Sequence, residues 1–288
     1  MYPQARRRWL AALILPLLAL GFVLSPSCQA EPGPIVEREE KSKYSKIRIL
    51  KEGSVRTLGF VQDSGEMIVE SRVDLERPHE LQLAYTRHMF TSYLFRPQQE
   101  RVLIVGLGGG AMVHFLKHYE PKVKVDVVEI DPAIVKIADQ YFGVRAGGNV
   151  AIHTADAFDY LKKTEQRYDV IYLDAFLKPS ADTDGNGIPL HLKTVQFYKD
   201  IQKKLTADGL VVYNVHPHDK VQADLKNISD AFPQCYVFRM PQLNGFVAVG
   251  SLAPKRLEVK SLKAAAEELN QRWQTSYSFR DMVDRLAP

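Results

Sequence analysis

Between residues 102 and 215, short runs of valine, isoleucine and leucine alternate with segments whose apolar residues recur at helical spacing. The strand candidates are residues 102–105, 123–128, 150–153, 170–173 and 210–215. The helix candidates between them are residues 111–118, 132–142, 157–163 and 192–205. Strands that are apolar on both faces and alternate with helices predict an α/β fold, with a parallel sheet covered on both sides.

The two ends of this α/β region predict different structure. Residues 47–78 contain short β-type runs broken by turn residues, which predicts a small N-terminal β-meander. Residues 79–95 have apolar residues at helical spacing, and residues 235–240 and 246–249 predict an antiparallel hairpin. A doubly wound, mostly parallel sheet that ends in such a hairpin is similar to the fold of the S-adenosylmethionine-dependent methyltransferases.

The first thirty residues have the features of a secretory signal. Three arginines at positions 6–8 precede an apolar run over residues 9–24, which is shorter than the roughly 20 residues that span a bilayer as a helix. Small residues follow, and cleavage after Ala30 is the first expectation. An uncleaved anchor, a lipidated Cys28 and a twin-arginine signal stay open. We therefore expect an exported protein, periplasmic or held at a membrane through its N-terminus.

The remaining boundaries follow from composition. Residues 31–46 are rich in proline and charge and predict a linker, residues 79–253 a nucleoside-binding domain, and residues 254–288 a helical C-terminal segment. The net charge is +4, and the three arginines of the signal leave 4 − 3 = +1 for the rest of the chain. A nearly neutral chain argues against a nucleic-acid partner.

A glycine-rich turn follows the first strand of the α/β region. Gly106, Gly108 and Gly110 occupy the stretch that leads into the next helix. Glycine lets the backbone turn sharply and approach a ligand, to which the helix then presents its N–H groups. The spacing also fits the dinucleotide fingerprint, so a nucleotide-dependent oxidoreductase that uses NAD stays open.

Acidic residues come at the ends of the following strands. Glu129 and Asp131 end the second strand, where a carboxylate accepts hydrogen bonds from ribose hydroxyls. Asp156 ends the third strand, where it and the N–H of Ala157 face an adenine ring; Asp131 and Asp156 are alternatively helix N-caps. Asp174 ends the fourth strand, at the edge where ligands bind in open α/β sheets, and is the candidate proton acceptor.

Together these motifs resemble those of the spermidine synthase, or polyamine aminopropyltransferase, family. The matching stretches are residues 102–111, 127–132, 154–157 and 168–174, and Tyr85 matches the tyrosine of the family's Tyr-x-Glu motif. The resemblance implies an adenosyl nucleoside held by Gly106, Gly108, Glu129 and Asp156, with Asp174 as the catalytic acid. It also implies decarboxylated S-adenosylmethionine or S-adenosylmethionine as donor, a small-molecule amine as acceptor, and a homodimer.

Three departures from the family lie at acidic positions. Gly109, Arg87 and Leu177 stand where the family has carboxylates around the cationic amines. A buried ammonium without a carboxylate costs several kcal/mol by order of magnitude. Asp182 and Asp184, in the loop of residues 178–188, are the candidates to replace that charge.

Several functions remain open on this basis. Aminopropyl transfer is preferred, and the alternatives are a methyltransferase, a non-catalytic nucleoside-binding exported protein and an NAD-dependent oxidoreductase. His114 and His118 share a helix face without an evident third ligand, so no metal site is predicted. His216 and His218 follow the fifth strand and are either loop residues or bases at the acceptor site.

Overall fold

The computed structural model describes residues 33–177, 181–184, 187–240 and 244–287. The expected signal and its alternative lipidation site Cys28 therefore lie outside the described residues. The expected export rests on these residues alone. Within the described ranges, no helix combines the length and the apolar character needed to cross a membrane.

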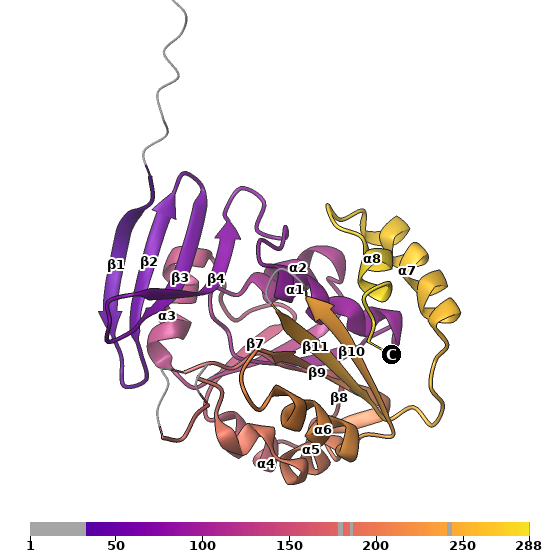
Figure 1. Cartoon of the computed structure of the whole chain (residues 1–288). Helices are drawn as coiled ribbons and strands as arrows, with labels where there is room; N and C mark the ends of the chain where they lie inside the picture. The colour runs from indigo at the N-terminus through magenta and orange to yellow at the C-terminus, as the bar shows by residue number, and fades with distance from the viewer. Residues whose placement is uncertain (1–32, 178–180, 185–186, 241–243, 288) are drawn as a thin grey trace, which may run out of the picture. The chain divides into compact units, whose positions relative to one another are not determined.

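The N-terminal sheet consists of four antiparallel strands in chain order (Figure 1). These strands are β1 (Ile35–Lys41), β2 (Lys46–Glu52), β3 (Val55–Val61) and β4 (Met67–Asp74). The predicted meander is confirmed. The linker predicted for residues 31–46 is wrong, because β1 pairs with β2 along its length. The sequence of β1 hides this because an edge strand with charged, exposed side chains lacks the apolar alternation of a buried strand.

The central sheet has seven strands in the order β10-β11-β9-β8-β5-β6-β7. They are β5 (Arg101–Val105), β6 (Lys124–Glu129), β7 (Val150–Thr154), β8 (Tyr168–Leu173), β9 (Leu205–Val215), β10 (Gln234–Met240) and β11 (Gly245–Ser251). Strands β5 to β9 run parallel, and the last two form the predicted antiparallel hairpin beside β9. This arrangement confirms the doubly wound, mostly parallel sheet.

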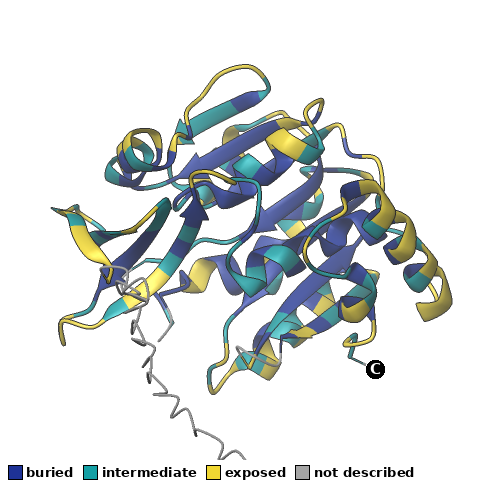
Figure 2. Cartoon of the chain, turned by 90° about the horizontal axis from the view of Figure 1, so that it is seen from above, coloured by how far each residue is buried: buried dark blue, intermediate teal, exposed yellow. Residues whose placement is uncertain are grey.

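Helices cover both faces of the central sheet, whose strands are buried in Figure 2. One face packs against α1 (Ala84–Met89), η1 (Phe90–Leu94), α2 (Ala111–Tyr119), α3 (Pro132–Phe142), α7 (Val259–Trp273) and α8 (Phe279–Val283). The other face packs against α4 (Ala157–Lys163), η2 (Leu190–Lys193), α5 (Val195–Gln202) and α6 (Val221–Ala231). Buried residues of the N-terminal sheet and of the C-terminal helices belong to the same core cluster.

Two helix predictions need correction, and one helix was missed. The helix expected over 79–95 begins only at Ala84 and ends in a 3-10 turn. The helix expected over 192–205 divides into η2 and α5, and β9 already begins at Leu205. Helix α6 was not predicted because its sequence is largely polar: Asp224 and Ile228 are its buried residues.

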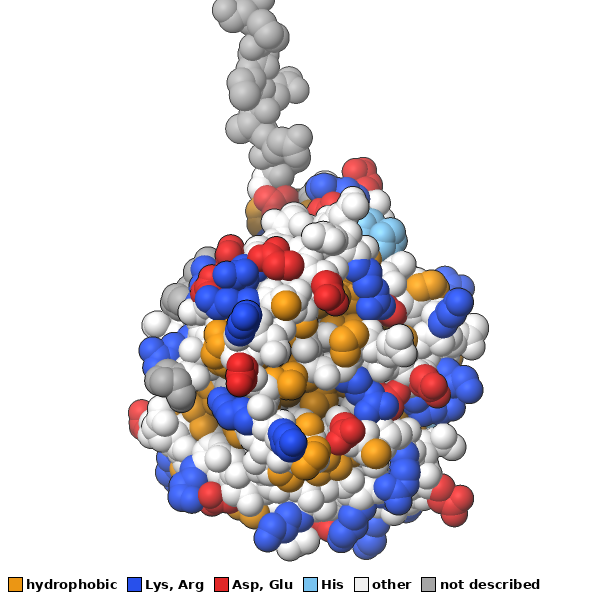
Figure 3. All heavy atoms as spheres, turned by 90° about the vertical axis from the view of Figure 1, so that its right-hand side faces the viewer, with side chains coloured by type: hydrophobic (Ala, Val, Ile, Leu, Met, Phe, Trp, Pro, Cys, Tyr) orange, Lys and Arg blue, Asp and Glu red, His pale blue; other side chains and the backbone are white. Residues whose placement is uncertain are grey.

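The surface on the side of α7 and α8 mixes both signs of charge. Figure 3 shows lysine and arginine side chains interspersed with acidic and apolar ones over this face. Trp273 anchors α7 from beneath, since its ring packs edge-on against Phe115 at 5.0 Å between centroids. The C-terminal helical segment is thus tied to the core, and this face carries no field of one sign.

Candidate functional site

A cavity opens at the carboxyl ends of β5, β6, β7 and β8 and is closed on one side by the N-terminal sheet. It brings together every site residue predicted from the sequence: Tyr85, Gly106, Gly108, Gly110, Glu129, Asp131, Asp156, Ala157 and Asp174. Glu70, which the sequence did not suggest, lines the same cavity. No lysine or arginine lines it among the residues that the structure describes. The cavity therefore offers several carboxylates and no fixed side-chain cation from this part of the chain.

The glycine turn is required by its geometry. Gly106, Gly108 and Gly110 have φ angles of +95°, +53° and +70°, the left-handed region that residues with a Cβ rarely adopt. A Cβ on Gly106 would collide with the backbone oxygen of Asp174. The glycine turn is thus packed directly against Asp174, the residue expected to do the chemistry.

Gly109 is confined for a different reason. A Cβ at this position would lie 2.8 Å from the ring of Phe142 and 2.9 Å from Oγ of Ser71. Ser71 comes from β4, so the N-terminal sheet fills the space that a side chain on this turn would use. The acid that the family carries here has no room unless these neighbours move.

Glu129 is buried and is held by the backbone on both sides. Its Oε2 accepts a hydrogen bond from the N–H of Leu107 and its Oε1 from the N–H of Asp131, both at 2.9 Å. Burial raises the pKa of Glu129 above its ordinary value, and these hydrogen bonds oppose that shift. Each carboxylate oxygen has a second lone pair, so Glu129 can accept two further hydrogen bonds, as the predicted contacts with ribose hydroxyls require.

Asp131 and Asp156 both cap helices and also line the cavity. Asp131 accepts from the N–H of Ala133 at the start of α3, at 2.9 Å, and its other oxygen accepts from the hydroxyl of Ser42 at 2.5 Å. Asp156 accepts from the N–H of Phe158 at the start of α4, at 2.7 Å. The capping interpretation describes real contacts of both residues, and the bond to Ser42 ties the N-terminal sheet to the nucleoside side of the cavity.

Asp174 follows directly after β8 and is half-buried. Its Oδ1 accepts a hydrogen bond from Nδ2 of Asn214 on β9, at 3.0 Å. Burial raises the pKa of Asp174 to about 6, while hydrogen bonds from Asn214 and Tyr85 oppose the rise. A carboxylate with this pKa is ionised at neutral pH and accepts a proton more readily than an exposed aspartate.

Glu70 is the site residue that the sequence analysis missed. It lies on β4, is half-buried, and has its backbone oxygen 3.0 Å from the hydroxyl of Tyr85, which donates to it. Burial, together with the nearby charge of Asp174, raises the pKa of Glu70 to about 8. The site thus holds a second carboxyl group close to the first, supplied by the N-terminal sheet.

The other departures from the family have structural explanations. Arg87 does not line the cavity: its Nε donates to the backbone oxygen of Leu81 at 2.8 Å, and its guanidinium lies over the ring of Tyr277. Leu177 lines the cavity, and its N–H donates to the backbone oxygen of Gly187 at 2.8 Å. A structural arginine and an apolar wall therefore stand where carboxylates were expected.

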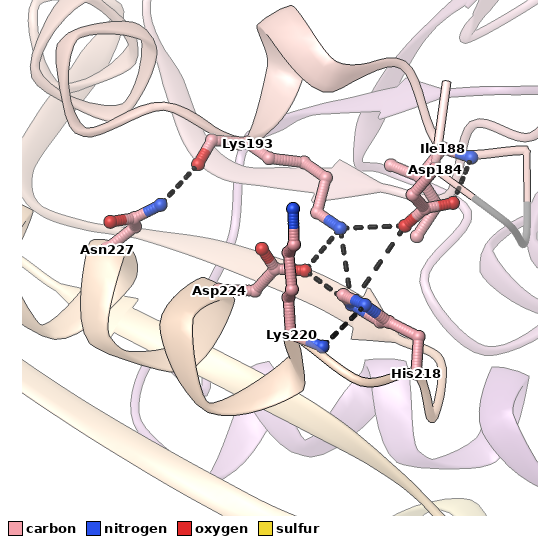
Figure 4. Close-up of polar contacts among 7 residues, drawn as sticks. All are labelled: Asp184, Ile188, Lys193, His218, Lys220, Asp224 and Asn227. Atoms are coloured by element: carbon pink, nitrogen blue, oxygen red, sulfur yellow. Dashed lines mark hydrogen bonds and ion pairs between the residues drawn. The ribbon is translucent and has the colours of Figure 1, made fainter. Parts of the chain in front are cut away.

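The loop acids do not supply the missing charge, because Asp182 and Asp184 do not line the cavity. In Figure 4, Asp184, Asp224 and His218 surround the ammonium group of Lys193. Lys193 Nζ lies 2.7 Å from Oδ2 of Asp184 and 3.3 Å from Nε2 of His218, and it is also paired with Asp224. The three groups that resemble a metal-binding set are already gathered around a cation of the chain itself.

The remaining histidine candidates have other contacts. The ring Nε2 of His114 lies 2.8 Å from the backbone oxygen of Phe142, and the ring of His118 stacks on His79 with centroids 3.7 Å apart. His216 packs its ring against Phe176, which lines the cavity. Of these three histidines, His216 is the one that approaches the site, through an aromatic neighbour, whereas His191 lines the cavity itself.

The doubly wound sheet, with a glycine turn and acids at successive strand ends, has the fold of the S-adenosylmethionine-dependent methyltransferases. Residues 83–260 match the family model of the spermine/spermidine synthase domain. The chain is 32% identical over 235 residues to the polyamine aminopropyltransferase of Vibrio vulnificus (strain CMCP6), covering 80% of this chain and 76% of the relative. The chain belongs to the spermine/spermidine synthase family.

Solved structures support the fold assignment. A spermidine synthase in complex with the transition-state analogue AdoDATO aligns with a TM-score of 0.66 at 21% identity, covering 88% of this chain and 85% of that one. Human methyltransferase-like protein 13 in complex with SAH aligns with a TM-score of 0.62 at 25% identity, covering 68% and 95%. The same fold is thus found in an aminopropyltransferase and in a methyltransferase.

Proposed function

We propose that this protein transfers an aminopropyl group from decarboxylated S-adenosylmethionine to a small amine. The observation that carries the proposal is the charge of the cavity. Its acids are Glu70, Glu129, Asp131, Asp156 and Asp174, and the described lining holds no lysine or arginine. A sulfonium donor with an ammonium tail and an amine acceptor are all cations, and burying cations is favourable only beside carboxylates.

The residues divide into a nucleoside half and a reacting half. In this proposal the glycine turn and Glu129 bind the ribose, and Asp156 and Ala157 bind the adenine, since all of them line the cavity. In the reaction, the acceptor nitrogen uses its lone pair to form a bond to the carbon next to the sulfonium. The carbon–sulfur bond breaks, its electron pair stays on sulfur, and 5′-methylthioadenosine leaves.

Asp174 accepts the proton that the attacking nitrogen must lose. Its carboxylate is ionised at neutral pH because the pKa is about 6, and Asn214 holds it in place by a hydrogen bond to Oδ1. Because the displacement needs no covalent enzyme intermediate, positioning and removal of this proton are the protein's main contributions.

Methyl transfer is the second candidate, and the resemblance to a methyltransferase bound to SAH favours it. The two donors differ by one carboxylate on the side chain attached to sulfur. In a cavity that Glu70 and Asp174 already line, close enough for the charge of Asp174 to raise the pKa of Glu70, that carboxylate would add a further negative charge. This electrostatic difference is the reason for preferring the decarboxylated donor.

The test uses the purified full chain with each donor and a panel of diamines and polyamines. Release of 5′-methylthioadenosine, measured by liquid chromatography and mass spectrometry, supports aminopropyl transfer. Release of S-adenosylhomocysteine instead assigns a methyltransferase. If neither product forms while both nucleosides bind in calorimetry, the protein is a nucleoside-binding protein without transferase activity. Binding of NAD alone overturns the proposal in favour of the oxidoreductase.

A further inference from the structure

We propose that Glu70 is the carboxylate of a cation subsite that binds the primary ammonium group of the alkyl chain attached to the nucleoside sulfur. The inference rests on the proposed function and adds to it the residue that selects the donor. Its starting point is geometric, since Glu70 lies on the N-terminal sheet and still lines the cavity formed by the central sheet.

A β-bulge places Glu70 in this position. In the pairing of β3 with β4, Leu58 faces Ser71 and Gly59 faces Val69, so Glu70 has no partner on β3. A bulge inserts one extra residue and redirects the side chains around it, and bulges are frequent beside active sites. Gly59 accommodates the bulge: a Cβ there would lie only 2.5 Å from the backbone oxygen of Ile68.

The bulge is fixed from two directions. The hydroxyl of Tyr85 on α1 donates to the backbone oxygen of Glu70, and Tyr85 also lies close enough to Asp174 for the two groups to interact electrostatically. On the next residue, the side chain of Ser71 packs over Gly108 and Gly109 of the nucleoside turn. Glu70 is therefore held next to the turn that approaches the donor and next to the residue proposed to take the proton.

The chain also explains why the carboxylate comes from β4. Ser71 and Phe142 fill the space over Gly109, so an acid on the glycine turn has no room. The residue directly before Ser71 is Glu70, which lines the cavity from β4. One strand thus both blocks the family's acidic position and supplies a carboxylate of its own.

Charge decides what this subsite binds. The titratable groups that line the cavity are Tyr44, Glu70, Tyr85, Glu129, Asp131, Asp156, Asp174 and His191. The pKa of Glu70 is raised to about 8 by burial and by Asp174, so without a ligand Glu70 is mainly protonated at pH 7. An ammonium group beside it favours the ionised form, so binding of a cation expels that proton.

The experiment compares two neutral-sulfur nucleosides that differ in charge. 5′-Methylthioadenosine has no ammonium group, whereas 5′-deoxy-5′-(3-aminopropylthio)adenosine carries one at the end of its alkyl chain. Their dissociation constants are measured by calorimetry at pH 7 on the wild-type full chain, Glu70→Gln and Glu66→Gln. Glu66 is an exposed acid directly before the first residue of the same strand, β4, and serves as the matched control.

We expect the wild type to bind the aminopropyl nucleoside at least about tenfold more tightly, as a charge-assisted hydrogen bond implies. Glu70→Gln should lose this preference and keep its affinity for 5′-methylthioadenosine, which shows that the variant is folded. Glu66→Gln should behave as the wild type does. If the wild type binds the two nucleosides with equal affinity, the cation subsite is overturned and the nucleoside site is retained. If the wild type binds neither nucleoside, the proposed function is overturned as well.

A second measurement needs no variant. Calorimetry of the wild type in two buffers with different ionisation enthalpies gives the number of protons released on binding. The aminopropyl nucleoside should release a large fraction of one proton at pH 7, and 5′-methylthioadenosine should release close to none. The same proton release with both ligands would contradict the assignment to Glu70.

Discussion

Asp174 shows how one side chain acquires its chemistry from its neighbours. It is half-buried, which disfavours the charge, and it accepts a hydrogen bond from Asn214, which favours it. The balance leaves a pKa of about 6, so the group is a base at neutral pH. The position of Asp174 after β8 was predictable from the sequence. Its partner Asn214 was not predictable, because Asn214 belongs to no motif and reaches Asp174 only through the pairing of β9 with β8.

Replacing this group gives a direct test. Asp174→Asn should lower kcat by about 10²- to 10⁴-fold, the range for loss of a positioned general base. The ratio of wild-type to variant rates should rise from pH 5 to pH 7 and then level off, because the wild-type carboxylate ionises with a pKa of about 6. A ratio that stays constant over this range would exclude Asp174 as the base, and unchanged affinity for 5′-methylthioadenosine controls for folding.

Among the elements, the strands and helices that carry the nucleoside residues were readable from the sequence. Their apolar runs end in glycine or acid at each strand tip, and parallel strands bring those tips to one edge. Glu70 was not readable, because a bulge breaks the period of two on which a strand prediction rests. Strand β1 and helix α6 were missed for a related reason. Both contain few buried apolar side chains, so their sequences lack the apolar periodicity that predicts a strand or a helix.

The charged cluster around Lys193 joins separate elements. Lys193 ends η2, Asp184 belongs to the preceding loop, and Asp224 lies on α6. The side chains of these three residues are only 6%, 8% and 9% exposed. Pro189 and Leu192, close to Lys193 in the chain, line the cavity. The pair of Lys193 with Asp224 therefore ties this wall of the cavity to helix α6.

Removal of the lysine charge should therefore destabilise the protein. Lys193→Met leaves two buried carboxylates without their cation, and we expect the free energy of unfolding to fall by about 3–5 kcal/mol. The matched change is Lys226→Met, which breaks an exposed pair with Asp230 and should cost less than about 1 kcal/mol. Urea unfolding of both variants measures the difference, and similar losses would show that the Lys193 cluster contributes no more than a surface pair.

For the whole molecule, the acid-rich cavity predicts how stability depends on pH. Burial raises the pKa of Glu70 from 4.5 to about 8 and that of Asp174 from 3.8 to about 6. At pH values between the ordinary and the raised pKa of each group, the folded chain binds more protons than the unfolded chain. The contribution of these groups to stability is therefore largest at low pH and declines as the pH rises toward 8.

The variant Glu70→Gln isolates one part of this dependence. Its free energy of unfolding relative to the wild type should increase from pH 4.5 to pH 8 and stay constant above pH 8, because Gln cannot ionise. Urea unfolding in the absence of nucleosides, repeated at several pH values, measures this difference. Glu66→Gln, on the exposed side of the hairpin, should show no such increase, and a flat difference for Glu70→Gln would contradict its raised pKa.

The bulge in β4 has an evolutionary consequence. A bulged strand differs from a regular one by a single residue, so the loss of one codon within Met67–Asp74 would restore even pairing with β3 and turn Glu70 away from the cavity. The glycine turn has no comparable freedom, because a Cβ on Gly106 would meet the backbone oxygen of Asp174. A change of one residue in β4 is therefore enough to remove a carboxylate from the cavity, whereas the glycine turn tolerates no comparable change.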